Sequence, residues 1–170
     1  MQLKLIGALL VFAACGGLGF RIAAYQRREE YTLRQIMGVL EQMECELQYR
    51  LTPLPNLCRQ AAVGAGAVLE RVFCLMSNEL ESQLSPDAER CMTHVLEDTH
   101  KLTPQSREVL LLLGKSLGKF DIDGQLKGIN AVKADCDRRI EKLSMNKDNR
   151  LRSYQTLGLC AGAALAILFL

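Results

Sequence analysis

The chain has 170 residues, of which 49% are hydrophobic and only 5% aromatic, and it contains no tryptophan. Its net charge of +2 is too small for a protein that neutralises many phosphates, which excludes nucleic acid as a partner. The length predicts one domain with an appendage, and the scarcity of aromatics favours packed helices over a β-sandwich. All 19 acidic residues lie between Glu29 and Asp148, so a polar middle separates two apolar ends.

The first predicted element is a transmembrane helix within residues 1–25. Residues 5–25 carry a single charge, Arg21, and about 20 apolar residues cross a bilayer core. An alternative starts from Phe12-Ala13-Ala14-Cys15, which has features of a lipoprotein cleavage site. On that hypothesis the chain is an extracytoplasmic lipoprotein anchored through Cys15.

Residues 26–153 predict a helical bundle, because helical spacing is frequent and no run alternates with a period of two. The first helix of the bundle is expected to continue directly from the membrane span and to end at Thr52-Pro53-Leu54-Pro55, since proline disfavours helix in the preceding residue. The apolar residues that share one face of this helix are Leu33, Ile36, Met37, Leu40, Met43 and Leu47.

Three shorter helices are predicted at residues 68–84, 86–97 and 104–117. Ser85 and Thr103 each precede a proline and are the expected N-caps. A last long helix is predicted to start near Asp123 or Gly124 and to run into the second apolar segment. The predicted fold class is therefore all-α, an antiparallel bundle of five or six helices flanked by N- and C-terminal transmembrane helices.

The last predicted element, residues 154–170, has 17 uncharged residues, the lower limit for a membrane span. A buried core helix is the alternative. Lysine and arginine at positions 21, 27, 28, 142, 147, 150 and 152 flank the two segments on the side of the bundle. This pattern predicts that the bundle lies in the cytoplasm with both termini across the membrane. Small residues four apart, Ala13 with Gly17 and Gly158 with Gly162, favour close pairing of the spans with each other, with partner proteins or with further copies in a homo-oligomer.

An apolar run ending in Gly114-Lys115-Ser116 has the outline of a phosphate-binding loop, which would make the chain an ATPase using Lys115. That loop needs a glycine at position 109, where the chain has Val109. The spacing instead predicts a helix that continues through Lys115 and stops at Gly118, with a new helix starting at Asp121 or Asp123. The stretch is therefore interpreted as a corner between helices.

Other chemical signals are weak. No two of the seven cysteines are closer than 13 residues, which favours a reducing compartment over a disulfide framework or a zinc site. His94 and His100 are six residues apart, which is not the spacing of a helical metal pair. The sequence predicts no catalytic residue, no cofactor and no metal.

Two short motifs occur in the middle of the chain. The first, Leu-Glu-x-Glu-Ile-x-Tyr-Gly-x-Thr-Pro-Leu, is met at Glu44, Glu46, Tyr49, Thr52, Pro53 and Leu54, and the chain departs from it at Met43, Leu47 and Arg50. The second, Leu-Gly-x-Ser-Leu-Gly-x-x-Asp, is met at Leu113, Gly114, Ser116, Leu117, Gly118 and Asp121, with Gln125 following. Together with the apolar stretches at both ends, these motifs resemble the stage III sporulation protein AB family over the whole chain.

The resemblance implies a non-enzymatic platform subunit in the mother-cell membrane of an endospore-forming bacterium. It implies a channel or secretion-like complex between mother cell and forespore, and a bundle similar to the F domain of type II secretion. The implied partners are a secretion-type ATPase (stage III sporulation protein AA), the other channel subunits and membrane lipid.

Candidate contacts with the ATPase are Glu44 and Glu46, expected to be exposed, together with Tyr49 and the Thr52-Pro53-Leu54 turn. The alternative is that Tyr49 and Leu54 pack inside the bundle and that the turn only joins two helices.

Overall fold

A computed structural model describes the backbone of residues 2–82, 87–99, 101–118 and 121–169, and the side chains of residues 24–82, 87–99, 101–118 and 121–145. Throughout this described part the structure is helical and contains no strand, which confirms the all-α prediction. The helices are α1 (Gln2–Arg50), α2 (Leu54–Ala62), α3 (Ala67–Glu81), α4 (Ala88–Glu97), α5 (Pro104–Ser116) and α6 (Ile122–Phe169).

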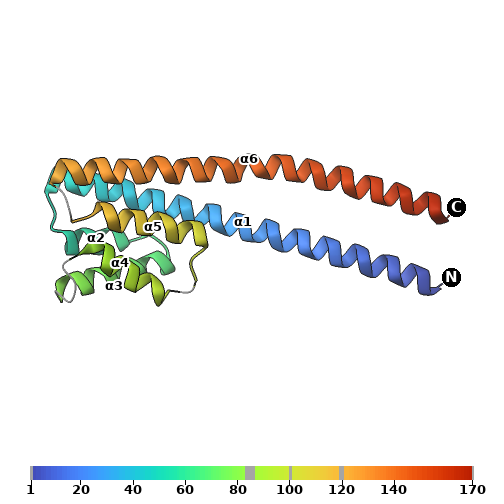
Figure 1. Cartoon of the computed structure of the whole chain (residues 1–170), viewed down its shortest axis with the longest axis horizontal. Coiled ribbons are helices and arrows are strands. Elements are labelled where there is room, and N and C mark those ends of the chain that lie inside the picture. The colour runs from blue at the N-terminus through green and yellow to red at the C-terminus, as the bar shows by residue number, and fades with distance from the viewer. Residues whose placement is uncertain (1, 83–86, 100, 119–120, 170) are drawn as a thin grey trace.

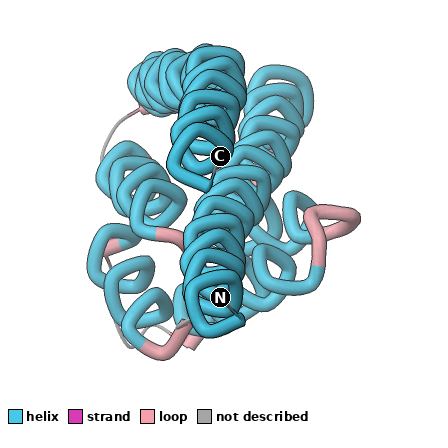
Figure 2. The backbone as a smooth tube through the Cα atoms, turned by 90° about the vertical axis from the view of Figure 1, so that its right-hand side faces the viewer, coloured by secondary structure: helices cyan, strands magenta, loops and turns pink. Residues whose placement is uncertain are grey.

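Two long helices, α1 and α6, organise the molecule. They run antiparallel side by side, and the four short helices pack against the part of this pair that is remote from the termini (Figure 1). The other parts of α1 and α6 leave the bundle on one side, so both chain ends face the viewer in Figure 2. The predicted continuity of the first and last bundle helices with the terminal segments is confirmed, since each is a single helix.

The core lies between the long pair and the short helices. The predicted apolar face of α1 is buried, with Leu33, Ile36, Leu40 and Met43 fully inaccessible to solvent. Burial of each such side chain contributes about 1.5–3 kcal/mol. Cys136 of α6 donates from Sγ to the Leu33 carbonyl oxygen at 3.3 Å, which fixes the register between α1 and α6.

Helix starts differ in part from those predicted. Asp87 caps α4, because its carboxylate accepts from the Glu89 N–H at 3.1 Å. The expectation that Ser85 is the cap was therefore wrong, and Ser85 itself lies outside the described residues. Thr103 precedes α5 as predicted, but its hydroxyl donates to Ser106 Oγ at 2.8 Å and makes no hydrogen bond to the helix backbone.

The predicted membrane spans fall largely outside the residues with described side chains, and so does Cys15, the anchor of the lipoprotein hypothesis. A search confined to described residues finds no helix with the length and apolar character needed to cross a membrane.

Candidate protein-interaction surface

The two family motifs come together at the end of the bundle remote from the chain termini (Figure 1). We call this region the distal end. It consists of the turn between α1 and α2 (residues 51–53), the end of α5 with Leu117 and Gly118, and the first turn of α6. A Cβ added to Gly118 would lie 3.4 Å from Cδ2 of Leu54, so residues from the two motifs lie close together.

Glu46 closes the turn between α1 and α2. Its side chain is only 14% exposed, and it accepts hydrogen bonds from Arg50 Nη1 at 3.1 Å and from Thr52 Oγ1 at 3.0 Å. The Gln60 amide, in the orientation that satisfies both of its polar atoms, donates to Glu46 at 2.7 Å. Glu46 is therefore largely buried and stabilises the turn, and the expectation that its side chain is exposed was wrong.

Glu44 also has a structural role, because it joins the two long helices. Lys133 of α6 donates to Glu44 Oε2 at 2.6 Å, and about a quarter of each side chain is exposed. The hydrogen bond from Lys133 lowers the pKa of Glu44, although partial burial opposes the shift. Glu44 was also expected to be exposed, and this expectation was wrong because Lys133 of α6 covers part of the carboxylate.

Tyr49 and Leu51 project from the distal end into solvent. The Tyr49 side chain is 75% exposed and that of Leu51 is 62% exposed, so the alternative in which Tyr49 packs in the bundle was wrong. Leu54, by contrast, packs partly buried against the core as that alternative proposed. Leu51 has a backbone φ of +52°, a left-handed conformation that costs a non-glycine residue about 1–2 kcal/mol. Among the described non-glycine residues, it alone has a positive φ.

Sequence reasoning did not identify Leu51 as a surface residue. It follows Leu47 by four residues, so helical spacing assigns it to the buried face. The chain leaves the helix at this point, because Thr52 precedes Pro53 and is biased towards extended backbone. The Thr52-Pro53 pair was therefore the sequence signal that the helical spacing of the buried face does not extend to Leu51.

The residues of the second motif build the corner between α5 and α6. Ser116 is the last residue of α5, Leu117 is fully buried, and Gly118 follows with φ +77°. Asp121 then caps α6, since its carboxylate accepts from the Gly124 N–H at 3.0 Å and its carbonyl accepts from the Gln125 N–H at 2.9 Å. The predicted interhelical corner is confirmed, with Asp121 as the residue that starts α6.

Gly114 and Lys115 lie within the last turn of α5. A Cβ added to Gly114 would lie 2.8 Å from Cβ of Met92, so this glycine allows α5 to approach α4. Lys115 lies 3.9 Å from the Glu89 carboxylate. The backbone here is helical and buried against α4, which is not the geometry of a phosphate-binding loop.

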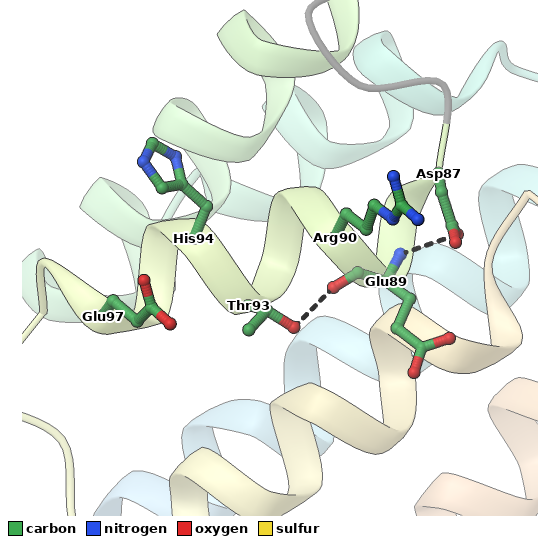
Figure 3. Close-up of a pocket in the computed structure, with 6 residues that line it drawn as sticks. All are labelled: Asp87, Glu89, Arg90, Thr93, His94 and Glu97. Atoms are coloured by element: carbon green, nitrogen blue, oxygen red, sulfur yellow. Dashed lines mark hydrogen bonds between the residues drawn. The ribbon is translucent and has the colours of Figure 1, made fainter.

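A hollow on the surface of α4 is lined by polar side chains (Figure 3): Asp87, Glu89, Arg90, Thr93, His94 and Glu97. Within it, Thr93 donates to the Glu89 carbonyl oxygen at 2.8 Å, and Asp87 caps the helix. His94 Nδ1 lies 2.6 Å from Glu79 Oε1 of α3, and this contact raises the pKa of His94. His94 is a surface residue as predicted, while His100 lies outside the described residues.

Among the described side chains, no His, Cys, Asp and Glu residues are grouped in a way that could hold a metal ion. The fold and the distal end thus define a class: an all-α bundle carried on two long terminal helices, with exposed apolar side chains at the far end.

Comparison with known proteins assigns the chain more narrowly. It belongs to the stage III sporulation protein AB family, whose model matches residues 4–170, and the family has a role in sporulation. Stage III sporulation protein AB of Bacillus subtilis (strain 168) is 26% identical over 172 residues, which cover 99% of this chain and all of the relative. A solved structure of a stage III sporulation protein AB matches with a TM-score of 0.61 at 23% identity, covering 72% of this chain and 98% of that one. This last likeness supports the fold.

Proposed function

We propose that the chain is a non-enzymatic platform subunit in the mother-cell membrane, part of a secretion-like channel complex between mother cell and forespore. We further propose that its distal end docks a secretion-type ATPase. The observation that carries the docking proposal is the exposure of Tyr49 and Leu51 on a turn fixed by Glu46. Aromatic anchors dominate many protein interfaces, and strained backbone such as that of Leu51 is concentrated at functional sites.

The arrangement of the long helices supports the membrane part of the proposal. The apolar sequences at residues 5–25 and 154–170 lie on the parts of α1 and α6 that leave the bundle on one side (Figure 1). With those parts inserted in a membrane, the distal end is the part of the bundle farthest from the bilayer. A cytoplasmic partner can therefore reach it without obstruction by lipid.

A reporter inserted in the exposed turn at residues 63 and 64 tests the topology. We expect a reporter that is active only in the cytoplasm to be active there. Activity of an extracytoplasmic reporter at the same site would contradict the proposal and would favour the lipoprotein hypothesis.

Docking is tested by purifying the full chain from membranes together with the ATPase, stage III sporulation protein AA. We expect Tyr49→Ala to lower the retained ATPase about tenfold, the effect of losing one interface anchor. Val63→Ala is the matched control, because Val63 is 74% exposed but lies in the turn between α2 and α3, away from the distal end.

Leu51→Gly separates binding from folding. Glycine adopts a positive φ at little cost, so this variant should fold at least as well as the wild type while retaining less ATPase. ATPase retention equal to that of Val63→Ala in both distal-end variants would contradict docking at this surface.

A further inference from the structure

A second hollow lies between α5 and α6, at the end of the bundle nearer the chain termini, where α5 begins (Figure 1). Its volume of about 370 Å³ is at the lower end of the range for small-molecule sites. Three of its lining residues are basic and one is acidic, whereas the hollow on α4 has three acids and one arginine. The lining residues are Gln105, Asp135, Arg138, Arg139, Lys142 and Leu143.

Arg139 forms a fixed wall of this hollow. Its Nε donates to Asp135 Oδ2 at 2.7 Å, and its Nη1 donates to Glu108 Oε2 of α5 at 2.8 Å. Only 21% of the Arg139 side chain is exposed, so these two carboxylates determine where the guanidinium lies. Arg139 therefore joins α5 to α6 and shapes the hollow between them.

Lys142 and Arg138 supply the accessible positive charge. Lys142 is exposed and makes no ion pair with a described residue. Arg138 is 70% exposed, and its ion pair with Asp135 is long, at 3.4 Å. The same carboxylate is held more closely by Arg139, at 2.7 Å. Both basic side chains can therefore turn towards an anion without losing a strong contact.

The hollow carries a net charge of +1. Its three basic side chains are opposed by two carboxylates, Asp135 in the lining and Glu108 paired with Arg139. Asp137 and Glu141 are exposed on the same stretch of α6, but they do not line the hollow. Ammonium and guanidinium groups are the usual partners of phosphate in proteins. A phosphodiester, with its single negative charge, matches this site.

The hollow also lies on the side of the bundle that faces the proposed membrane. On α1 the first apolar segment ends at residue 25, and Arg28 follows it by about 4.5 Å along the helix. Arg28 Nη2 donates to the carbonyl oxygen of Lys101, three residues before the start of α5, at 3.5 Å. On α6, three of the four charged residues between the hollow and the second apolar segment are basic: Lys147, Asp148, Arg150 and Arg152.

We propose that this hollow binds a negatively charged phosphate group through Lys142 and Arg138, with the Gln105 amide as an uncharged donor. Its position favours the headgroup of an anionic phospholipid as the source, because basic side chains near a bilayer attract anionic lipid. That source rests on the proposed membrane function. Free phosphate has the same chemistry and is the other source.

Lipid binding is measured on the full chain in dodecyl maltoside micelles by native mass spectrometry. The probe is short-chain phosphatidylglycerol, and the reference is phosphatidylcholine of the same chain length, whose headgroup has no net charge. We expect phosphatidylglycerol to bind about tenfold more tightly, since two basic side chains meet its phosphate. Equal affinities for the two lipids would overturn the proposal.

Substitutions locate the site. Lys142→Ala and Arg138→Ala should each weaken phosphatidylglycerol binding about fivefold, the usual contribution of one basic side chain near an anionic headgroup, and Lys142→Arg should retain binding. Lys127→Ala is the matched control, because Lys127 is exposed on the same helix and lies 15 residues from Lys142. Affinities of the two alanine variants equal to that of the control would overturn the proposal. Unchanged thermal midpoints show that the variants are folded.

Inorganic phosphate distinguishes the two sources. Displacement of phosphatidylglycerol by excess inorganic phosphate would support a site open to free phosphate, and retention of the lipid would support a headgroup site. A chain that remains in membranes but binds neither probe through Lys142 overturns the site alone. A chain absent from membranes contradicts the proposed function, and Lys142-dependent binding of inorganic phosphate would still support the site.

Discussion

The Thr52 hydroxyl donates to the Glu46 carboxylate at 3.0 Å across the end of α1, so the turn that exposes Tyr49 and Leu51 is held from inside the bundle. Removing this carboxylate leaves donors from Arg50, Thr52 and Gln60 without their acceptor. We expect Glu46→Ala to lower the free energy of unfolding by about 1–2 kcal/mol. Thermal unfolding of the full chain in mild detergent measures this, with the exposed Gln48→Ala as control. Equal midpoints for the two variants would contradict a structural role for Glu46.

Two helical glycines should respond to alanine with opposite signs. Gly114→Ala places a Cβ 2.8 Å from Cβ of Met92, and such overpacking costs about 1–3 kcal/mol. Gly38→Ala meets no atom within 4 Å and should raise stability by about 0.5–1 kcal/mol through helix propensity. The same detergent unfolding experiment compares them. If Gly114→Ala were stabilising, the close approach of α5 to α4 at this glycine would be incorrect.

Stability should depend on the ionisation of His94. The contact with Glu79 is the main cause that raises the pKa of His94 above its ordinary value of 6.5, and the charges of Asp98 and Glu97 add to it. The stabilisation is complete below the pKa of the unfolded chain and is lost as pH rises through the raised pKa of the folded chain. NMR titration of the imidazole should show the raised pKa, and Glu79→Gln should return it towards 6.5. An unchanged titration in that variant would show that Glu79 is not the cause.

Thiol labelling should divide the described cysteines into two groups. Burial raises the pKa of Cys58 to about 12 and that of Cys136 to about 11, and Cys91 is also buried. Because the thiolate is the reactive form, maleimide at neutral pH should modify Cys45 and Cys74 and spare the other three. Mass spectrometry of digested protein locates the labels. Rapid labelling of Cys58 in the native chain would contradict the burial of this side chain in the core.

The sequence predicted features that depend on neighbours along the chain. The continuity of α1, the stop at Gly118 and the restart at Asp121 follow from local spacing and from the backbone preferences of glycine and aspartate. The pattern of apolar residues likewise identified the buried face of α1, from Leu33 to Leu47.

Features that depend on distant contacts were not predicted. Glu44 is paired because α6 brings Lys133 to it from 89 residues away, and no local pattern contains that information. Glu46 is enclosed because α2 folds back with Gln60. At α4 the N-cap is Asp87 and not the expected Ser85.

The unbroken course of α1 gives the molecule a mechanical property. Forty-nine residues of helix, from Gln2 to Arg50, form a rod about 74 Å long, which enters the bundle without a proline or a loop to act as a hinge. If the outer half of this rod were tilted, the turn that carries Leu51 would be displaced with it, because no break in α1 absorbs the movement.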